Sequence, residues 1–354
     1  MTSVVVRAPG KVVLIGEYAV LDGAEALVLA VDRYVRVEIR RRRGAESVLH
    51  ARGLDLGRVL FSFSADDQLI WGHSHHQLEL TRRLIEAGYT RCRASGGSWP
   101  ALEIEIDTSA LHAEDGQGGK LGLGSSAAVA VALDRALDEV LAGPVLSISE
   151  RLHRLLPLYR AFQDGQGSGI DLAASLSGGL SSYRIVEDRA RLEPLSWPGA
   201  LRPVFVWTGT PASTPELVAA YRQWQQRDPL QAGPLVNDMT ACAARAVAAV
   251  SANQPDQLMT CLHDYRRLLG TMSSLMGAEV LSLEHQQLAE LAARYGLVYK
   301  PCGAGGGDLG MAVGNDRSAI RDFAEAVVEL GAHVMDLAPA ASGVERICPE
   351  QRET

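Results

Sequence analysis

The chain has 354 residues, enough for two domains, and 47% of them are hydrophobic while 21% are charged. This balance is typical of a globular protein and excludes a disordered, collagen-like or coiled-coil chain. Lys and Arg number 34 against 42 Asp and Glu, which gives a formal net charge of −8. Nucleic acids and membrane surfaces bind basic faces, so this charge argues against both as partners, while it allows a local pocket for a small anion.

The cysteines and the first residues indicate a protein of the reducing cytoplasm. Five cysteines are scattered along the chain without a Cys-x-x-Cys pair, so neither a disulfide framework nor a thiolate zinc site is expected. The first residues lack a basic segment followed by a long apolar run, and no later stretch approaches the roughly 20 apolar residues of a membrane span. We therefore expect no targeting signal, no membrane anchor and a cytoplasmic location.

The first third of the chain is rich in short β-branched runs. Strands are predicted over residues 4–6, 12–15, 34–39 and 102–106. In the last run Leu102, Ile104 and Ile106 alternate with acidic residues, as expected for a strand with one buried face. A long helix is predicted to follow over residues 127–141, with Asp134 and Asp138 on its exposed part.

The second half alternates helical patterns with short strands. Helices are predicted over residues 215–227, 235–250, 258–276, 281–295 and 316–330, and strands over 203–208, 297–300 and 310–313. Strands concentrated early, with a mixture of strands and helices later, predict an α+β fold. Pro194 and Pro198 lie in a stretch that is poor in strand signals, so we divide the chain there into two domains, 1–190 and 191–354.

The sharpest local feature is a glycine loop directly before the long helix. Lys120 precedes Gly122 and Gly124, which Ser125 and Ser126 follow. Glycines expose backbone N–H groups, a helix N-terminus adds partial positive charge, and a lysine and two hydroxyls stand close by, so the loop suits a polyphosphate. The plain alternative is a glycine turn into a helix that a serine caps. The dinucleotide and Walker patterns both fit poorly, because no strand directly precedes the glycines and the lysine lies before them.

Two further segments accompany this loop. Residues 8–23 place Lys11 and Glu17 at the two ends of an apolar strand, and residues 300–308 form a second glycine loop that ends at Asp308. With all three segments in view, the chain resembles the GHMP kinases, and their order and separation match that family over nearly the whole chain. We call residues 9–18 the first motif, 122–128 the second and 303–308 the third. The resemblance implies an α+β architecture of two domains, the N-terminal one like ribosomal protein S5 domain 2 and the C-terminal one ferredoxin-like.

Within the family the chain most resembles bacterial phosphomevalonate kinases. The segments that carry this likeness are residues 16–18, 31–35, 167–175 and 207–214. The resemblance implies ATP-dependent phosphorylation of (R)-5-phosphomevalonate to the diphosphate, a step of the mevalonate pathway of isoprenoid biosynthesis, by a monomer or homodimer. A mevalonate kinase or a mevalonate-type decarboxylase is an alternative of the same family, and a catalytically silent ligand-binding relative is an alternative of another class.

The resemblance also assigns roles in nucleotide binding, with ATP and Mg²⁺ as cofactors. The ATP phosphates are expected on the second motif, at Gly122, Leu123, Gly124, Ser125, Ser126 and Ala127. The Ser126 hydroxyl is the expected protein ligand of Mg²⁺. Lys120 and Lys11 are the catalytic cations, and Asp171 is the catalytic base or orients the acceptor. Without its context, Asp171 is equally well explained as a helix N-cap.

Polar residues of several segments are expected to bind the small phosphorylated acceptor. The implied substrate-binding residues are Lys11, Glu17, Tyr18, Ser168, Ser213, Thr214, Gly305 and Gly306. Ser213 and Thr214 also open the helix at 215–227, where a capping arrangement is expected. Asp308 has no expected role beyond ordering the third motif.

One position departs from mevalonate kinases in an informative way. Where those enzymes carry a glutamate that helps to bind Mg²⁺, this chain has Arg160. A cation does not bind Mg²⁺, but it suits the phosphate of an acceptor that is already phosphorylated. The alternative is a solvated helix residue. In either case water and phosphate oxygens would have to complete the metal shell.

A histidine cluster invites a metal interpretation. His73, His75 and His76 lie in a loop before a helix predicted from residue 77 to 87. Because no acidic or thiolate partner stands at ligand spacing, we expect no metal there.

Overall fold

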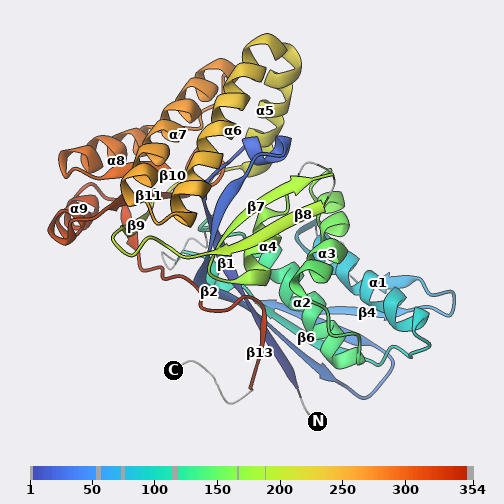
Figure 1. Cartoon of the computed structure of the whole chain (residues 1–354). Coiled ribbons are helices and arrows are strands. Elements are labelled where there is room, and N and C mark those ends of the chain that lie inside the picture. Colours follow the sequence, from blue (N-terminus) through green and yellow to red (C-terminus); the bar gives the residue numbers. More distant parts are fainter. Residues whose placement is uncertain are drawn as a thin grey trace.

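The computed structural model describes residues 3–52, 57–72, 76–113, 119–165, 167–187 and 189–348. It has two lobes, each built on a β-sheet with helices packed against it (Figure 1). The first lobe holds β1–β8, β13 and α1–α4, and the second holds β9–β12 and α5–α9. None of the helices in these ranges combines the length and apolar character that crossing a membrane requires.

The nine-stranded sheet of the first lobe is organised around β2 (Ala26–Arg41). Its order is β13-β1-β2-β6-β3-β4-β5, with β7 also paired to β2 and β8 to β7. Neighbouring strands are antiparallel, except that β3 and β6 are parallel. The other strands are β1 (Val4–Ile15), β3 (Ser47–Arg52), β4 (Val59–Phe63), β5 (Leu69–Trp71), β6 (Leu102–Asp107), β7 (Leu180–Val186), β8 (Arg189–Leu195) and β13 (Glu345–Ile347).

β1 carries the start of the first motif through this sheet. The prediction of separate strands at 4–6 and 12–15 is wrong, because one strand runs through Pro9 and Gly10 with a register shift against β2. An irregularity of this kind accommodates a proline without ending the strand. On its other edge β1 pairs with β13 only from Val5 to Arg7, so Pro9 has no ladder bond to lose there.

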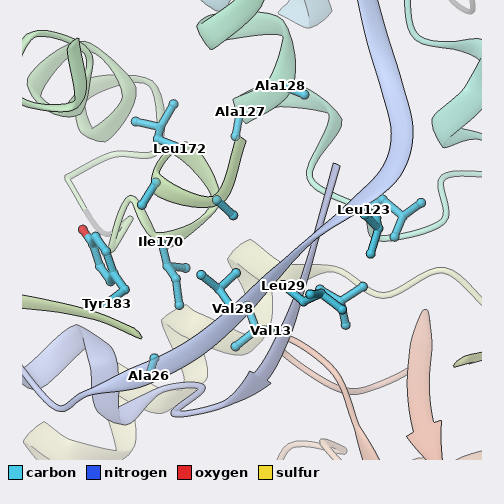
Figure 2. Packing of buried hydrophobic residues seen from close by; sticks show 14 of the residues in the cluster. Val13, Ala26, Val28, Leu29, Leu123, Ala127, Ala128, Ile170, Leu172 and Tyr183 are labelled. Atoms are coloured by element: carbon cyan, nitrogen blue, oxygen red, sulfur yellow. The ribbon is translucent and has the colours of Figure 1, made fainter. Parts of the chain in front are cut away.

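Helices cover β1 and β2 where the second motif enters. α2 (Ser125–Leu141) and α4 (Ile170–Ser177) pack on these two strands, and Figure 2 shows Ala127 and Leu172 of the helices and Val13 and Val28 of the strands in one buried cluster. The other helices of this lobe are α1 (Glu79–Ala94) and α3 (Ile148–Phe162). The unbroken Ala, Val and Leu pattern of α2 is therefore explained by burial of most of its surface.

The prediction that Asp134 and Asp138 lie on an exposed part of α2 is wrong. Both are buried, with 1% and 7% of their surface exposed. Arg151 and Arg154 of α3 pair with both carboxylates, and Arg91 of α1 donates to Asp134 at 3.0 Å. The two buried carboxylates are paired with arginines of two other helices. The hydrophobic periodicity of α2 alone does not reveal these partners.

The four-stranded sheet of the second lobe confirms the ferredoxin-like expectation. β9 (Arg202–Trp207), β10 (Val298–Pro301), β11 (Leu309–Gly314) and β12 (His333–Met335) form an antiparallel sheet in the order β10-β11-β9-β12. With helices after β9 and β11, this is the β-α-β-β-α-β arrangement. α8 (Leu283–Arg294) and α9 (Arg317–Glu329) pack on it around a separate core that includes Val206, Leu288 and Phe323.

Three long helices complete the second lobe. They are α5 (Thr214–Arg227), α6 (Pro229–Ser251) and α7 (Pro255–Met276). The chain leaves the first sheet at the end of β8 and enters the second at β9, and after β12 it returns to pair as β13 with β1. The exact division into domains 1–190 and 191–354 stays a prediction.

Candidate active site

The second motif forms a turn that leaves the start of α2 open. Gly122 and Gly124 have φ values of 72° and 76°, in the left-handed region that favours glycine. Gly124 is the N-cap of α2, and the structure gives it no side-chain capping bond. The alternative in which a serine caps this helix is therefore wrong. Ser125 and Ser126 are half-buried at the helix start, where the first-turn amides offer donors and partial positive charge to an anion.

The first motif lies against this loop. The Lys11 backbone amide donates to the carbonyl of Leu123 at 2.8 Å, and the Lys11 ammonium donates to the carbonyl of Gly122 at 2.9 Å. A Cβ at Gly124 would lie 3.0 Å from carbon atoms of the Lys11 side chain. The structure thus brings one predicted cation into direct contact with the predicted ATP loop.

The third motif reaches the same loop from the second lobe. A Cβ at Gly122 would lie 2.6 Å from the carboxyl carbon of Asp308, so the carboxylate packs on the loop backbone. The Ala212 amide donates to Asp308 Oδ1 at 3.1 Å. Burial raises the pKa of Asp308, and the Ala212 amide and the Lys11 charge oppose that rise. All three motifs therefore meet at Gly122.

Asp171 is held at the start of α4. Gly169 is the N-cap of this helix and Asp171 lies inside its first turn, so the N-cap interpretation of Asp171 is wrong. Tyr159 O–H donates to Asp171 Oδ2 at 2.6 Å, and the Leu172 amide donates to Oδ1 at 3.0 Å. One turn further along the same face of α4, the buried hydroxyl of Ser175 donates to the Pro9 carbonyl at 2.8 Å, which docks α4 on the first motif.

Arg160 and Ser168 form hydrogen bonds in the loop that leads to Asp171. Arg160 Nε donates to the Gly167 carbonyl at 3.2 Å, and Tyr183 O–H donates to the Ser168 carbonyl at 2.6 Å. Burial and the charge of Asp171 raise the pKa of Tyr183, while the positive charge of Arg160 acts in the opposite direction. Arg160 is half-buried, and whether it binds a phosphate or is a solvated helix residue stays a prediction.

Glu17 and Tyr18 are buried contacts between the lobes. Glu17 Oε1 accepts from Lys300 and from the Gly303 amide, while the Glu17 carbonyl accepts from Tyr265 O–H at 2.6 Å. Burial raises the pKa of Glu17 and the Lys300 charge lowers it. Tyr18 O–H donates to the Ala304 carbonyl. Their predicted contact with a substrate stays a prediction, since each side chain already joins the first motif to the third.

The remaining predicted site residues differ in how far they are buried: Gly305 is buried and Gly306 half-buried, whereas the other three residues are exposed. Gly306 donates its amide to the Val280 carbonyl at 2.8 Å, and Gly305 is buried against the same carbonyl. Ser213 is the N-cap of α5 without a side-chain capping bond, so the expected capping is wrong, and Ser213 and Thr214 are both exposed. Lys120 is exposed and forms a backbone bridge with His112. The substrate and catalytic roles of these residues stay predictions.

Comparison with known proteins decides the family. Residues 81–179 match the GHMP kinases N terminal domain. The chain is 32% identical to the phosphomevalonate kinase of Streptomyces sp. strain CL190, across 97% of this chain and 98% of the relative. The chain belongs to the GHMP kinase family. This confirms the resemblance that the three motifs predicted.

Other GHMP relatives align over the whole length as well. The mevalonate kinase of Thermococcus gammatolerans is 28% identical across 98% of this chain and 99% of its own. Among solved structures, the Streptococcus pneumoniae phosphomevalonate kinase in complex with phosphomevalonate and AMPPNP superposes with a TM-score of 0.75 at 20% identity, covering 96% of this chain and all of that one. The latter likeness confirms the two-domain α+β fold.

Three buried side chains that sequence reasoning does not assign contact residues of the predicted site or of the third motif. Tyr159 holds Asp171, Lys300 holds Glu17, and His285 contacts the Tyr299 hydroxyl and the Gly307 carbonyl, both at 2.8 Å. Lys300 and its partner are 283 positions apart, so no local pattern connects them. The available signal is the lone lysine in an apolar run at residues 297–302.

The residues present fit a metal that is held mainly by the nucleotide. Within the described ranges, no group of three His, Cys, Asp or Glu side chains is arranged to hold a metal ion. A hydroxyl at the open end of α2 beside free helix amides matches Mg²⁺, which keeps several waters and binds phosphate oxygens. Of the histidine cluster, residues 73–75 lie outside the described part of the chain.

Proposed function

We propose that this GHMP kinase transfers the γ-phosphoryl group of ATP to (R)-5-phosphomevalonate, giving mevalonate 5-diphosphate and ADP. The observation that carries the proposal is the meeting of Lys11, Gly122 and Asp308 beside the uncapped start of α2. It is supported by the full-length similarity to a phosphomevalonate kinase and by a related fold that binds phosphomevalonate and an ATP analogue. The step belongs to the mevalonate pathway, and we propose that it takes place in the cytoplasm.

In this proposal the second motif binds ATP through its main chain. The amides from Gly122 to Ala127 would surround the phosphates, with the helix dipole of α2 favouring their charge. Ser126 would give one hydroxyl oxygen to Mg²⁺, and phosphate oxygens and water would complete the shell. When bound, Mg²⁺ supplies charge neutralisation of the phosphates. Lys120, which is exposed, would contribute its charge to the same phosphates.

The acceptor would lie between Asp171 and Lys11. Asp171, fixed by Tyr159, would accept a proton or hydrogen bond from the acceptor and hold its oxygen in line with the γ-phosphorus. Lys11 would stabilise the charge that spreads over the transferring group. Ser168, Ser213 and Thr214 are proposed to contact the rest of the acceptor.

Arg160 is proposed to bind the phosphate that the acceptor already carries. Its guanidinium lies half-buried beside the loop that leads to Asp171, and a charge-assisted bond to phosphate is strong at such a position. This residue favours phosphomevalonate over mevalonate. Arg160→Gln should therefore raise the KM for phosphomevalonate at least about tenfold, with little effect on the Kd for ATP.

The deciding experiment compares acceptors. Purified protein is mixed with Mg·ATP and mevalonate, phosphomevalonate or mevalonate diphosphate, and ADP release is followed in a coupled assay. We expect release with phosphomevalonate only. Release with mevalonate would instead support a mevalonate kinase, which the similarity to mevalonate kinases makes the second candidate. Release with the diphosphate would support a decarboxylase, and no release with any acceptor would support a silent relative.

A further inference from the structure

Asp308 ends the third motif at the point where the two lobes meet in the site. We infer that Asp308 is a positioning residue for phosphoryl transfer: its carboxylate fixes the ATP loop at Gly122 and draws the Lys11 ammonium to the same point. The inference rests on the proposed function, because it concerns the same site. It gives the residue a role beyond ordering its own motif.

The carboxylate touches the ATP loop directly. A Cβ added to Gly122 would lie 2.6 Å from both the carboxyl carbon and Oδ2 of Asp308, which leaves no room for a side chain on the loop. Asp308 itself has a φ of 55°, an uncommon value for a residue other than glycine. The strained backbone and the tight packing together set how closely the third motif approaches the second.

Lys11 reaches the same glycine from the first lobe. Its ammonium donates to the Gly122 carbonyl at 2.9 Å, and its positive charge stabilises the ionised form of Asp308. A lysine ammonium has three N–H donors. With one N–H on the carbonyl of Gly122, the glycine on which Asp308 packs, the ammonium is held in place and keeps a donor for a phosphoryl oxygen.

Asp308 is also fixed to the segment that leads to α5. Its amide donates to the Thr210 carbonyl at 2.7 Å, its carbonyl accepts from the Thr208 amide at 3.0 Å, and Oδ1 accepts from the Ala212 amide at 3.1 Å. Ala212 directly precedes Ser213 and Thr214, which are proposed to contact the acceptor. A single residue therefore sets the spacing between the acceptor segment and the ATP loop. Since misplacement by about 1 Å can cost 10²-fold in rate, this spacing matters for transfer.

Two substitutions separate the charge of Asp308 from its shape. Asp308→Asn keeps an oxygen for the Ala212 amide and nearly the same volume but loses the charge, whereas Asp308→Ala loses all three. We expect kcat with phosphomevalonate to fall at least about tenfold in both variants. The Kd for Mg·AMPPNP, measured by calorimetry, should stay within about threefold of wild type in Asp308→Asn, because the loop keeps its packing and no longer faces a negative charge.

Asp316→Asn is the matched control. Asp316 is exposed at the start of α9 and accepts from the Ser318 and Ala319 amides, away from the three motifs, so its variant should keep wild-type kcat. A kcat for Asp308→Asn within about twofold of wild type would overturn the inference, as would an equal loss in AMPPNP affinity, which indicates a collapsed loop. If wild type prefers mevalonate, the proposed function fails and the Asp308 comparison is made with that acceptor. No ADP release by wild type with any acceptor overturns both.

Discussion

His285 should make the second lobe sensitive to acid. Burial lowers the pKa of His285 to about 4 from an ordinary value of 6.5. Because the Gly307 carbonyl only accepts, Nε2 carries the proton and donates to it, while Nδ1 accepts from Tyr299 O–H. The folded state therefore needs the neutral ring, and the unfolded state takes up a proton first as the pH falls.

The sign and size of the effect follow from these values. The stabilisation is complete above pH 6.5 and is lost as the pH falls from 6.5 towards 4, with a full loss of about 3 kcal/mol. Between about pH 7.5 and about pH 5, wild type should lose about 2 kcal/mol of unfolding free energy that a variant without this titration keeps.

Urea unfolding followed by tryptophan fluorescence at the two pH values measures this loss. His285→Gln retains an amide donor for the Gly307 carbonyl and does not titrate, so it should show a smaller loss than wild type. His153→Gln, at an exposed position on α3, is the control and should behave as wild type. Equal losses in wild type and His285→Gln would refute the reasoning.

Three further substitutions test the site. Asp171→Asn should lower kcat by about 10²-fold or more while the Kd for ATP stays close to wild type, and near wild-type turnover would remove Asp171 from the catalytic set. Gly122→Ala should weaken AMPPNP binding at least about tenfold, because the new Cβ meets Asp308 at a left-handed φ. Gly119→Ala is the control, because its Cβ would lie 3.7 Å from Trp207, and it should leave AMPPNP binding unchanged. Equal AMPPNP affinity of the two variants would contradict the loop geometry. Lys300→Met should lower the unfolding free energy by about 3–5 kcal/mol by leaving Glu17 unpaired, and adding Glu17→Gln should restore much of that loss. An unchanged stability of Lys300→Met would show that this pair is not needed.

The sequence predicted well what local pattern determines. The helix at α2 follows from its unbroken run of Ala, Val and Leu, and the three glycine motifs identified the family because glycine is needed where backbones approach closely. The prediction of separate strands on either side of Pro9 was wrong, because a register shift against β2 lets one strand continue through the proline. Such a shift can be seen only in the pairing of the two strands. The three-residue strand β13 carries too short a pattern to predict, since its existence depends on pairing with β1 from the opposite end of the chain.

At the candidate site too, local sequence predicted which residues are present but not which of them contact each other. Lys11, Gly122 and Asp308 come together, although nothing in their sequence spacing shows that all three meet at one glycine. Glu17 is a polar residue in a glycine-containing motif, and its pairing with Lys300 of the second lobe is not visible in the sequence. Ser213 stands at the N-cap position before a helix, where serine is a favoured capping residue, but its side chain makes no capping bond. Such contacts depend on tertiary packing, which overrides local preference.

The return of the chain to its first sheet has a consequence for biosynthesis. While the polypeptide is being made, β1 has one edge without its neighbour until residues 345–347 have left the ribosome, because these residues supply β13. An uncovered strand edge is a template for pairing with other chains. The nascent N-terminal half therefore keeps an uncovered edge until the end of translation, and expressing this half alone would leave that edge without β13.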